Sequence, residues 1–213
     1  MTIYDDTLSQ YITATFAPED EPARRAREDS PKHGLPAISI RAEEGRFLQV
    51  LAAAASAKNA LEIGTLGGYS GIWIARGLAE GGTLITLEMS EKHSAVARAH
   101  FDGAGVGGRV EIMIGDAHEQ LGKLSPRGPF DFVFIDAEKT GYPAYYAWAV
   151  EHVSPGGIIC AHNAFRGGRL LEATEDAEVA GMRAFLELVA GDSRVTSTIF
   201  PGGDGTLVAV KLG

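Results

Sequence analysis

Short apolar segments of strand character alternate with helical segments through most of the chain, and this alternation limits the fold more than any other feature. Runs rich in Val, Ile, Leu and Phe predict strands at 59–63, 83–88, 109–114, 131–135 and 157–161. Apolar residues at helical spacing predict helices between them, at 70–78, 91–101, 118–121 and 142–153. Such a βα repeat forms a parallel sheet flanked by helices, so the predicted fold class is α/β.

Both ends of the chain depart from the repeat. After a helix predicted near 175–189, strands at 194–200 and 206–212 are separated by a short turn at 201–205, which leaves no room for a crossover helix. These two strands must therefore form an antiparallel hairpin. Before the repeat, apolar residues between Ile3 and Phe16 predict an amphipathic helix, a charged segment follows at 18–32, and another helix should begin near Ala42. We expect one domain over 1–213, with an N-terminal helical appendage at 1–35 and a core at 36–213.

Composition narrows the class of protein and its surroundings. The 213 residues carry 19 Lys and Arg against 28 Asp and Glu, a net charge of -9, which argues against a nucleic-acid partner. The first residues lack the pattern of a signal peptide and no apolar run could span a bilayer, so we expect a cytoplasmic protein without a membrane partner. Cys160 is the only cysteine, which excludes an internal disulfide, and we expect it to be buried.

Charged residues follow abruptly where the most apolar strand ends. The run from Phe130 to Ile135 is followed by Asp136, Ala137, Glu138 and Lys139. Ligands of parallel sheets bind just beyond the carboxyl ends of the strands. Asp136 and Lys139 could hold a cation and move a proton there, or they could belong to a solvated turn.

A glycine-rich turn follows the first strand of the repeat, at 64–71. It matches neither the dinucleotide pattern G-x-G-x-x-G nor a Walker loop, so neither ligand is favoured. Glu88 ends the second strand, where a carboxylate can accept hydrogen bonds from ribose hydroxyls. Asp116 and Ala117 follow the third strand and could contact an adenine edge. Together these features indicate an adenosine-type ligand.

Five motifs follow one another along the chain: Glu62-Ile63-Gly64-Thr65 with Gly68-Tyr69-Ser70, then Glu88, then Gly115-Asp116-Ala117, then Phe132 to Lys139, then Gly156-Gly157 leading to His162-Asn163. In this order and spacing they resemble bacterial S-adenosylmethionine-dependent O-methyltransferases of the caffeoyl-CoA and catechol type. The resemblance extends from about Ile38 to the C-terminus. It implies a class I methyltransferase fold, which is Rossmann-like, with a seven-stranded, mostly parallel sheet whose last strand is antiparallel.

The resemblance also implies a set of cofactor contacts. For S-adenosylmethionine these are Ile40, Glu62, Gly64, Thr65, Ser70, Glu88, Asp116, Ala117, Asp136 and Glu138. Carboxylates around the pocket would favour the cationic sulfonium, and glycines would let the methionine moiety lie against the backbone. The alternative for Glu62 is a partly buried acid that accepts hydrogen bonds from backbone N–H groups.

The family pattern further implies a divalent cation and a catalytic base. By position, Asp136 is a metal ligand with a catalytic role and Lys139 is the base that takes the phenolic proton. The alternative for Lys139 is a surface lysine paired with Glu138. At the second metal position this chain has His162-Asn163 where the family usually has Asp-Asn.

The predicted metal ligands are therefore Asp136, His162 and Asn163, with one formal negative charge where the family has two. Replacement of a carboxylate by an imidazole should weaken Mg²⁺ and favour Mn²⁺, Fe²⁺, Co²⁺ or Zn²⁺. Alternatively, His162 is a catalytic base or a hydrogen-bonded residue beside a lost metal site.

The function implied by the resemblance is methyl transfer to a hydroxyl of a small catechol-like or phenolic acceptor, with Phe165 and Arg166 near that acceptor. Two alternatives remain: a methyltransferase for a modified uridine of tRNA, and a protein that binds the cofactor without turnover. The remaining histidines are expected on solvated faces and at helix ends. Because the N-terminal helix has an apolar stripe, we expect a homodimer.

Overall fold

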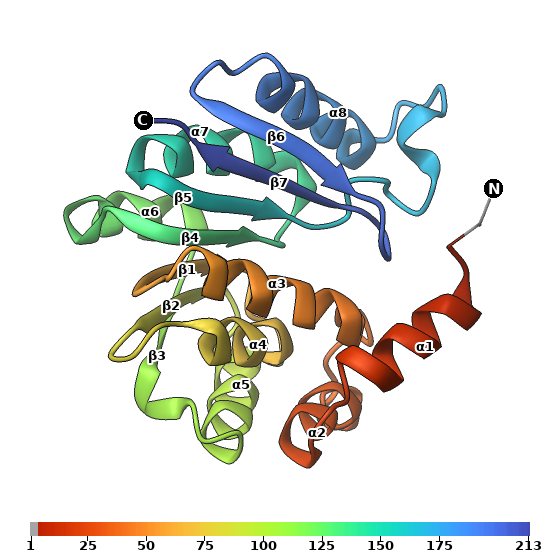
Figure 1. Cartoon of the computed structure of the whole chain (residues 1–213), viewed down its shortest axis with the longest axis vertical. Coiled ribbons are helices and arrows are strands. Elements are labelled where there is room, and N and C mark those ends of the chain that lie inside the picture. The colour runs from red at the N-terminus through yellow and green to blue at the C-terminus, as the bar shows by residue number, and fades with distance from the viewer. Residues whose placement is uncertain (1–3) are drawn as a thin grey trace.

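The computed structural model describes residues 4–213 and contains one seven-stranded sheet in the order β3-β2-β1-β4-β5-β7-β6 (Figure 1). The strands are β1 (Asn59–Ile63), β2 (Thr83–Glu88), β3 (Val110–Ile114), β4 (Phe130–Ile135), β5 (Val153–Ala161), β6 (Val195–Phe200) and β7 (Thr206–Lys211). All seven predicted strands are present, and β5 begins four residues earlier than predicted (153 against 157).

The first five strands are parallel, and β7 is antiparallel to both of its neighbours, β5 and β6. The predicted reversal of the last strand and the closing hairpin are thus confirmed. Chain order reverses beside β1, whose neighbours are β2 on one side and β4 on the other. In open α/β sheets this switch point leaves a crevice beyond the strand ends.

Helices cover both faces of the sheet (Figure 1). On one face lie α3 (Ala42–Ala54), α4 (Tyr69–Gly77) and α5 (Glu91–Gly103), and on the other lie α6 (Ala117–Leu124), α7 (Tyr142–His152) and α8 (Ala177–Ala190). The central strand β4 faces both layers, because Phe132 and Phe134 pack with the first group and Val133 and Ile135 with the second. This double burial explains why every residue of β4 except Asp131 is apolar.

The N-terminal segment contains two helices, α1 (Asp6–Phe16) and α2 (Glu21–Asp29). The predicted helix is present, although Ile3 lies outside the described residues. No individual helix was predicted within the charged segment at 18–32, and α2 lies there. Asp20 caps α2, Glu21 pairs with Arg25 four residues on, and two small residues, Ala23 and Ala26, are fully buried.

Other sequence expectations concern burial and membranes. Cys160 is buried in β5, as predicted. Among residues 4–213, no helix is both long enough and apolar enough to cross a bilayer.

Candidate active site

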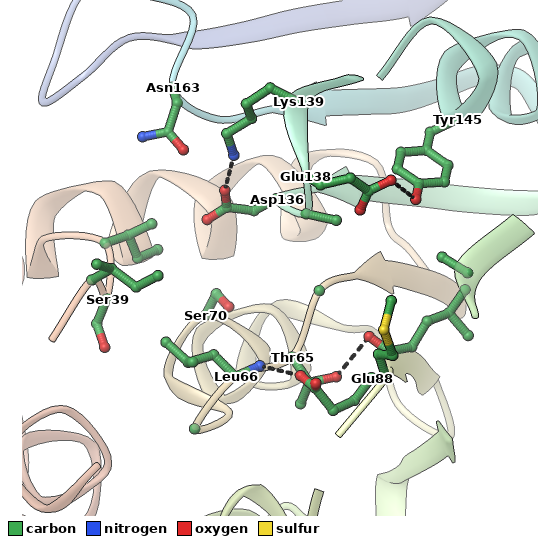
Figure 2. Close-up of a pocket in the computed structure, with 18 of the residues that line it drawn as sticks. Ser39, Thr65, Leu66, Ser70, Glu88, Asp136, Glu138, Lys139, Tyr145 and Asn163 are labelled. Atoms are coloured by element: carbon green, nitrogen blue, oxygen red, sulfur yellow. Dashed lines mark hydrogen bonds and ion pairs between the residues drawn. The ribbon is translucent and has the colours of Figure 1, made fainter. Parts of the chain in front are cut away.

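A cavity of about 530 Å³ lies beyond the carboxyl ends of β1, β2 and β4. Its walls come from the loop before α3, the glycine-rich turn, and the segments that follow β2, β3, β4 and β5. Figure 2 shows Asp136, Glu138 and Lys139 on one side and Thr65, Leu66 and Glu88 on another. The topology of the sheet therefore collects motifs that are distant in sequence.

Most of the predicted cofactor residues lie in the wall of this cavity. They are Ile40, Gly64, Thr65, Ser70, Glu88, Ala117, Asp136 and Glu138. Glu62 and Asp116 do not line it. Asp116 instead caps α6, where its side chain accepts a hydrogen bond from Glu119 N. A direct ligand contact by either residue stays a prediction.

The glycine-rich turn is fixed to the end of β2 by hydrogen bonds. Gly64 N donates to Leu87 O at 3.1 Å, and Leu66 N donates to Glu88 Oε2 at 2.8 Å. Gly64 has a φ of +102°, and a Cβ there would lie 2.2 Å from the backbone oxygen of Asp136. Only glycine therefore lets the turn lie against the residue that follows β4.

Glu88 is held at the floor of the cavity. Besides the bond from Leu66, its Oε1 accepts a hydrogen bond from Ser90 N at 2.9 Å and lies 3.4 Å from His93 Nδ1. His93 was expected on a solvated helix face, but it lies next to this carboxylate. The position of Glu88 at the tip of β2 is the one that the ribose prediction requires.

Glu62 is fully buried beneath the cavity wall. Ser70 Oγ donates to its Oε1 at 2.5 Å and Thr86 Oγ1 donates to its Oε2 at 2.6 Å, so hydroxyl groups rather than the expected backbone N–H groups satisfy it. Burial raises the pKa of Glu62 to about 7, although both hydrogen bonds act in the opposite direction. Ser70 lines the cavity, so Ser70 connects Glu62 to the cavity wall.

Lys139 is buried at the end of β4, with 7% of its surface exposed. Its Nζ donates to Asp136 Oδ1 at 2.8 Å and to the Tyr142 hydroxyl at 2.7 Å. The alternative of a surface lysine paired with Glu138 is therefore wrong. Burial would raise the pKa of Asp136, but the nearby His162 and the Lys139 cation outweigh it and hold that pKa well below its usual range.

Sequence reasoning missed Tyr142, which orients the lysine. Its hydroxyl donates to the backbone oxygens of Ile135 and His162, both at 3.2 Å. Burial, strengthened by the nearby Asp136 carboxylate, raises the pKa of Tyr142 well above its usual value, so the hydroxyl stays protonated. Its place three residues after Lys139, at the start of a predicted helix, was the available signal.

The structure brings His162 next to Asp136, as the predicted metal site requires. His162 Nδ1 lies 3.4 Å from Asp136 Oδ2, yet Nδ1 is buried without a hydrogen bond from the described residues. The other ring nitrogen, Nε2, lies 2.8 Å from Glu44 Oε1. Asn163 follows with a φ of 60°, and its Nδ2 donates to Asp204 Oδ2 at 3.0 Å.

Glu44 is the second residue that sequence reasoning missed. It lies in the first turn of α3, 4% exposed, and its Oε2 accepts a hydrogen bond from Arg41 N at 2.8 Å. Burial alone would lower the pKa of His162, but the Asp136 and Glu44 carboxylates outweigh burial and raise it to about 10. The position therefore attracts positive charge strongly.

A second tyrosine, Tyr145, lines the cavity beside Glu138. The Tyr145 hydroxyl donates to Glu138 Oε1, and the ring of His118 stacks on Tyr145 at 4.7 Å between centroids (Figure 2 labels Tyr145 and Glu138). Glu138 therefore pairs with a tyrosine in the wall and not with Lys139. Sequence reasoning had no role for Tyr145 and placed His118 on a solvated face.

A second cavity of about 540 Å³ adjoins the first and shares Ile38, Ser39, Ile40 and Asn163 with it. Its remaining lining residues are Arg41, Glu44, His162, Phe165, Gly167, Gly168, Gly203 and Asp204. Of the two predicted acceptor contacts, Phe165 lies here, whereas Arg166 lines the first cavity and pairs with Glu178. Asn163 lines both cavities, whereas His162 lines only the second.

Comparison with known proteins identifies the family. Residues 14–212 match the family described as O-methyltransferase. A catechol O-methyltransferase of Niastella koreensis is 42% identical over 91% of this chain and 89% of its own length, and one of Mycobacterium tuberculosis is 38% identical over 95% and 94%. The solved O-methyltransferase of Bacillus cereus in complex with SAH is 39% identical, with a TM-score of 0.91 over 96% of this chain and 97% of that one.

The chain therefore belongs to the O-methyltransferase family. The match covers nearly all of the chain, and the structural similarity confirms the predicted class I methyltransferase fold. The predicted enzyme class, an O-methyltransferase, is confirmed as well.

Proposed function

We propose that the chain transfers the methyl group of S-adenosylmethionine to a hydroxyl of a small catechol-like or phenolic acceptor. The observation that carries this proposal is the buried cluster of Asp136, Lys139 and Tyr142 at the cavity wall. A lysine that is buried and hydrogen-bonded to two side chains is typical of a functional site rather than of a solvated surface. The relatives named as catechol O-methyltransferases support the choice of acceptor.

The first cavity suits the methyl donor. Its walls hold the carboxylates of Glu88 and Glu138 at opposite sides, and the closely packed Gly64 turn lies between them. Carboxylates attract a cationic sulfonium, and an acid at the tip of β2 can accept hydrogen bonds from a ribose. The Bacillus cereus relative in complex with SAH, the product left after methyl transfer, supports this assignment.

The second cavity suits the acceptor. It presents the ring of Phe165 and the guanidinium of Arg41, and it meets the donor cavity at Asn163. A flat phenol in this cavity would direct a hydroxyl toward Asp136 and Lys139. Lys139 Nζ would take the phenolic proton, while the Tyr142 hydroxyl and Asp136 hold the amine in place.

The residues present fit a divalent cation that accepts both oxygen and nitrogen ligands. Asp136 Oδ2 and His162 Nδ1 lie 3.4 Å apart, Nδ1 has no hydrogen bond from residues 4–213, and Asn163 is adjacent. These three side chains would hold the ion. Such a cation would lower the pKa of an acceptor hydroxyl and orient it for in-line transfer.

One labelling assay tests the proposal. Full-length protein is incubated with methyl-labelled S-adenosylmethionine, a panel of catechols and bulk tRNA, with and without Mn²⁺, and the label is followed. We expect label in a catechol. Label in RNA alone would replace the proposal with the tRNA alternative, and cofactor binding without transfer to any acceptor would support the non-catalytic alternative.

A further inference from the structure

We propose that Glu44 is a positioning residue that holds His162 with Nδ1 toward Asp136, and so makes this site select Mn²⁺, Fe²⁺, Co²⁺ or Zn²⁺ over Mg²⁺. The inference rests on the proposed function for the existence of a cation site. It adds a residue from α3 that belongs to none of the five sequence motifs. It also gives the histidine at the second metal position a defined orientation.

Glu44 can fix the imidazole because Glu44 is itself fixed. Its carboxylate lies in the buried first turn of α3, with Oε2 accepting from Arg41 N at 2.8 Å and Oε1 lying 2.8 Å from His162 Nε2. A histidine that gives its Nε2–H to a carboxylate can present the Nδ1 lone pair on its other side once a binding metal ion displaces the Nδ1 proton. Metal-binding histidines are commonly oriented by such a carboxylate partner.

On the other side of the ring, Nδ1 and Asp136 Oδ2 form an ion pair at a spacing that one bound cation could also bridge. The Nδ1 to Oδ2 distance of 3.4 Å is longer than the roughly 2.7–2.9 Å of a charge-assisted hydrogen bond, and Nδ1 makes no hydrogen bond with the described residues. Two donor atoms that each bind one cation at about 2.1 Å lie about 3.0–3.4 Å apart for bond angles between a right angle and the tetrahedral angle.

The other two predicted ligands, Asp136 and Asn163, are likewise each held by a hydrogen bond through one side-chain atom. Asp136 gives Oδ1 to Lys139, and Oδ2 faces the imidazole. Asn163 gives Nδ2 to Asp204, which leaves its amide oxygen without a hydrogen bond from residues 4–213. Each ligand is thus held through one atom while a second atom remains for the ion. Three independent anchors of this kind are unexpected for a site without a ligand.

Glu44 also restores the negative charge that is lost where His162 replaces the family's aspartate. The three ligands carry one negative charge, at Asp136, because histidine and asparagine are neutral ligands. Glu44 contributes a second carboxylate directly behind the imidazole, where it increases the electron density on the ring. The position thus combines nitrogen donation with a total of two carboxylates, a combination that suits later transition metals better than Mg²⁺.

The test is direct metal binding by the full chain. Chelator-treated protein is titrated calorimetrically with Mn²⁺, Co²⁺, Zn²⁺ and Mg²⁺, and Co²⁺ binding is also followed by its visible absorption spectrum. We expect Mn²⁺, Co²⁺ and Zn²⁺ to bind more tightly than Mg²⁺. Glu44→Ala should weaken Mn²⁺ binding on the order of 10- to 100-fold. Glu44→Gln keeps one acceptor oxygen, which can serve His162 Nε2–H, and should weaken Mn²⁺ binding less.

Two further variants complete the design. Glu43→Gln changes the neighbouring buried glutamate, which bonds Ser9 and Thr13 and not His162, so its metal affinity should stay within about twofold. His162→Asp should shift the preference back toward Mg²⁺. Thermal unfolding of every variant separates loss of the site from loss of the fold, because Glu44 also caps α3.

Each outcome decides one claim. If the wild-type protein binds none of these ions at micromolar concentration, or if Glu44→Ala, while folded, binds Mn²⁺ like the wild type, the inference is wrong. Metal binding with the expected order but no methyl transfer to any catechol would contradict the proposed function and leave the inference standing. Methyl transfer to a catechol by protein that binds no metal would contradict the inference and leave the proposed function standing.

Discussion

Lys139 is the residue whose replacement should separate chemistry from binding. Lys139→Met keeps an unbranched side chain at the buried position but removes the amine that contacts Asp136 and Tyr142. We expect kcat for a catechol acceptor to fall on the order of 100-fold or more, with little change in the affinity for S-adenosylmethionine. Steady-state kinetics and calorimetry measure the two effects.

Lys123→Met is the matched control, because Lys123 lies exposed on α6 and does not line either cavity. If kcat for Lys139→Met stays within threefold of the wild-type value and kcat for Lys123→Met is unchanged, Lys139 is not the base that takes the phenolic proton.

Glu62 couples stability to pH. Burial raises the pKa of this carboxyl from 4.5 to about 7, so the folded state binds the proton more tightly than the unfolded state does. The free energy of unfolding should therefore fall as pH rises from about 4.5 to about 7, by on the order of 3 kcal/mol from this group. Glu62→Gln should remove that part of the decline.

Urea unfolding of the wild type and of Glu62→Gln at several pH values between 4.5 and 8 measures this difference. Parallel pH profiles for the two proteins would show that Glu62 does not titrate as its burial implies.

At the scale of elements, one methyl group added in the glycine-rich turn should disturb the packing between β1 and the segment after β4. Gly64→Ala places a Cβ at a φ of +102° and 2.2 Å from the Asp136 backbone oxygen, so β1 and the segment after β4 must separate. We expect a loss of about 3 kcal/mol of unfolding free energy, together with weaker cofactor binding. Chemical unfolding and cofactor calorimetry give both values.

Gly108→Ala is the control, since nothing lies within 4 Å of its added Cβ and its φ is not positive. Equal stability of the two variants would contradict the packing argument.

The elements of the core were predictable from sequence because the central strands β1, β2, β4 and β5 carry short runs of apolar residues that are buried. The helix α2 was missed because six of its nine residues are charged, and its buried face consists only of Ala23 and Ala26. Local pairs and a cap stabilise such a helix, and neither produces an apolar stripe. The start of β5 was missed because Pro155, Gly156 and Gly157 lie within it.

The candidate site was predictable where a motif ends a strand, as at Glu88 and Asp136. Glu44 was not, because it meets His162 across 118 residues and no local pattern records that contact. Tyr142 and Tyr145 appeared only as helix residues, since their hydroxyl partners are fixed by tertiary packing. The sequence thus indicated which residues carry chemistry, and the structure added the residues that orient them.

At the scale of the whole molecule, the N-terminal helix supports the predicted homodimer, which remains a prediction. The polar face of α1 is bound to α3 through Glu43, which accepts hydrogen bonds from Ser9 and Thr13. Tyr11 and Phe16 remain 61% and 63% exposed. We expect light scattering at micromolar concentration to give a dimer, and Tyr11→Ser with Phe16→Ser to shift the mass toward a monomer. A monomeric wild type would contradict the prediction.

The turn between β6 and β7 has a consequence for the order in which the protein is made. Asp204 accepts the hydrogen bond from Asn163, and Gly203 lies so close to Glu44 that a Cβ there would overlap its carboxylate. Ribosomes release the N-terminal helices and the five parallel strands before this turn is synthesised. The nascent chain can thus acquire most of its sheet early, whereas the wall around His162 is completed only once Gly203 and Asp204 have been translated.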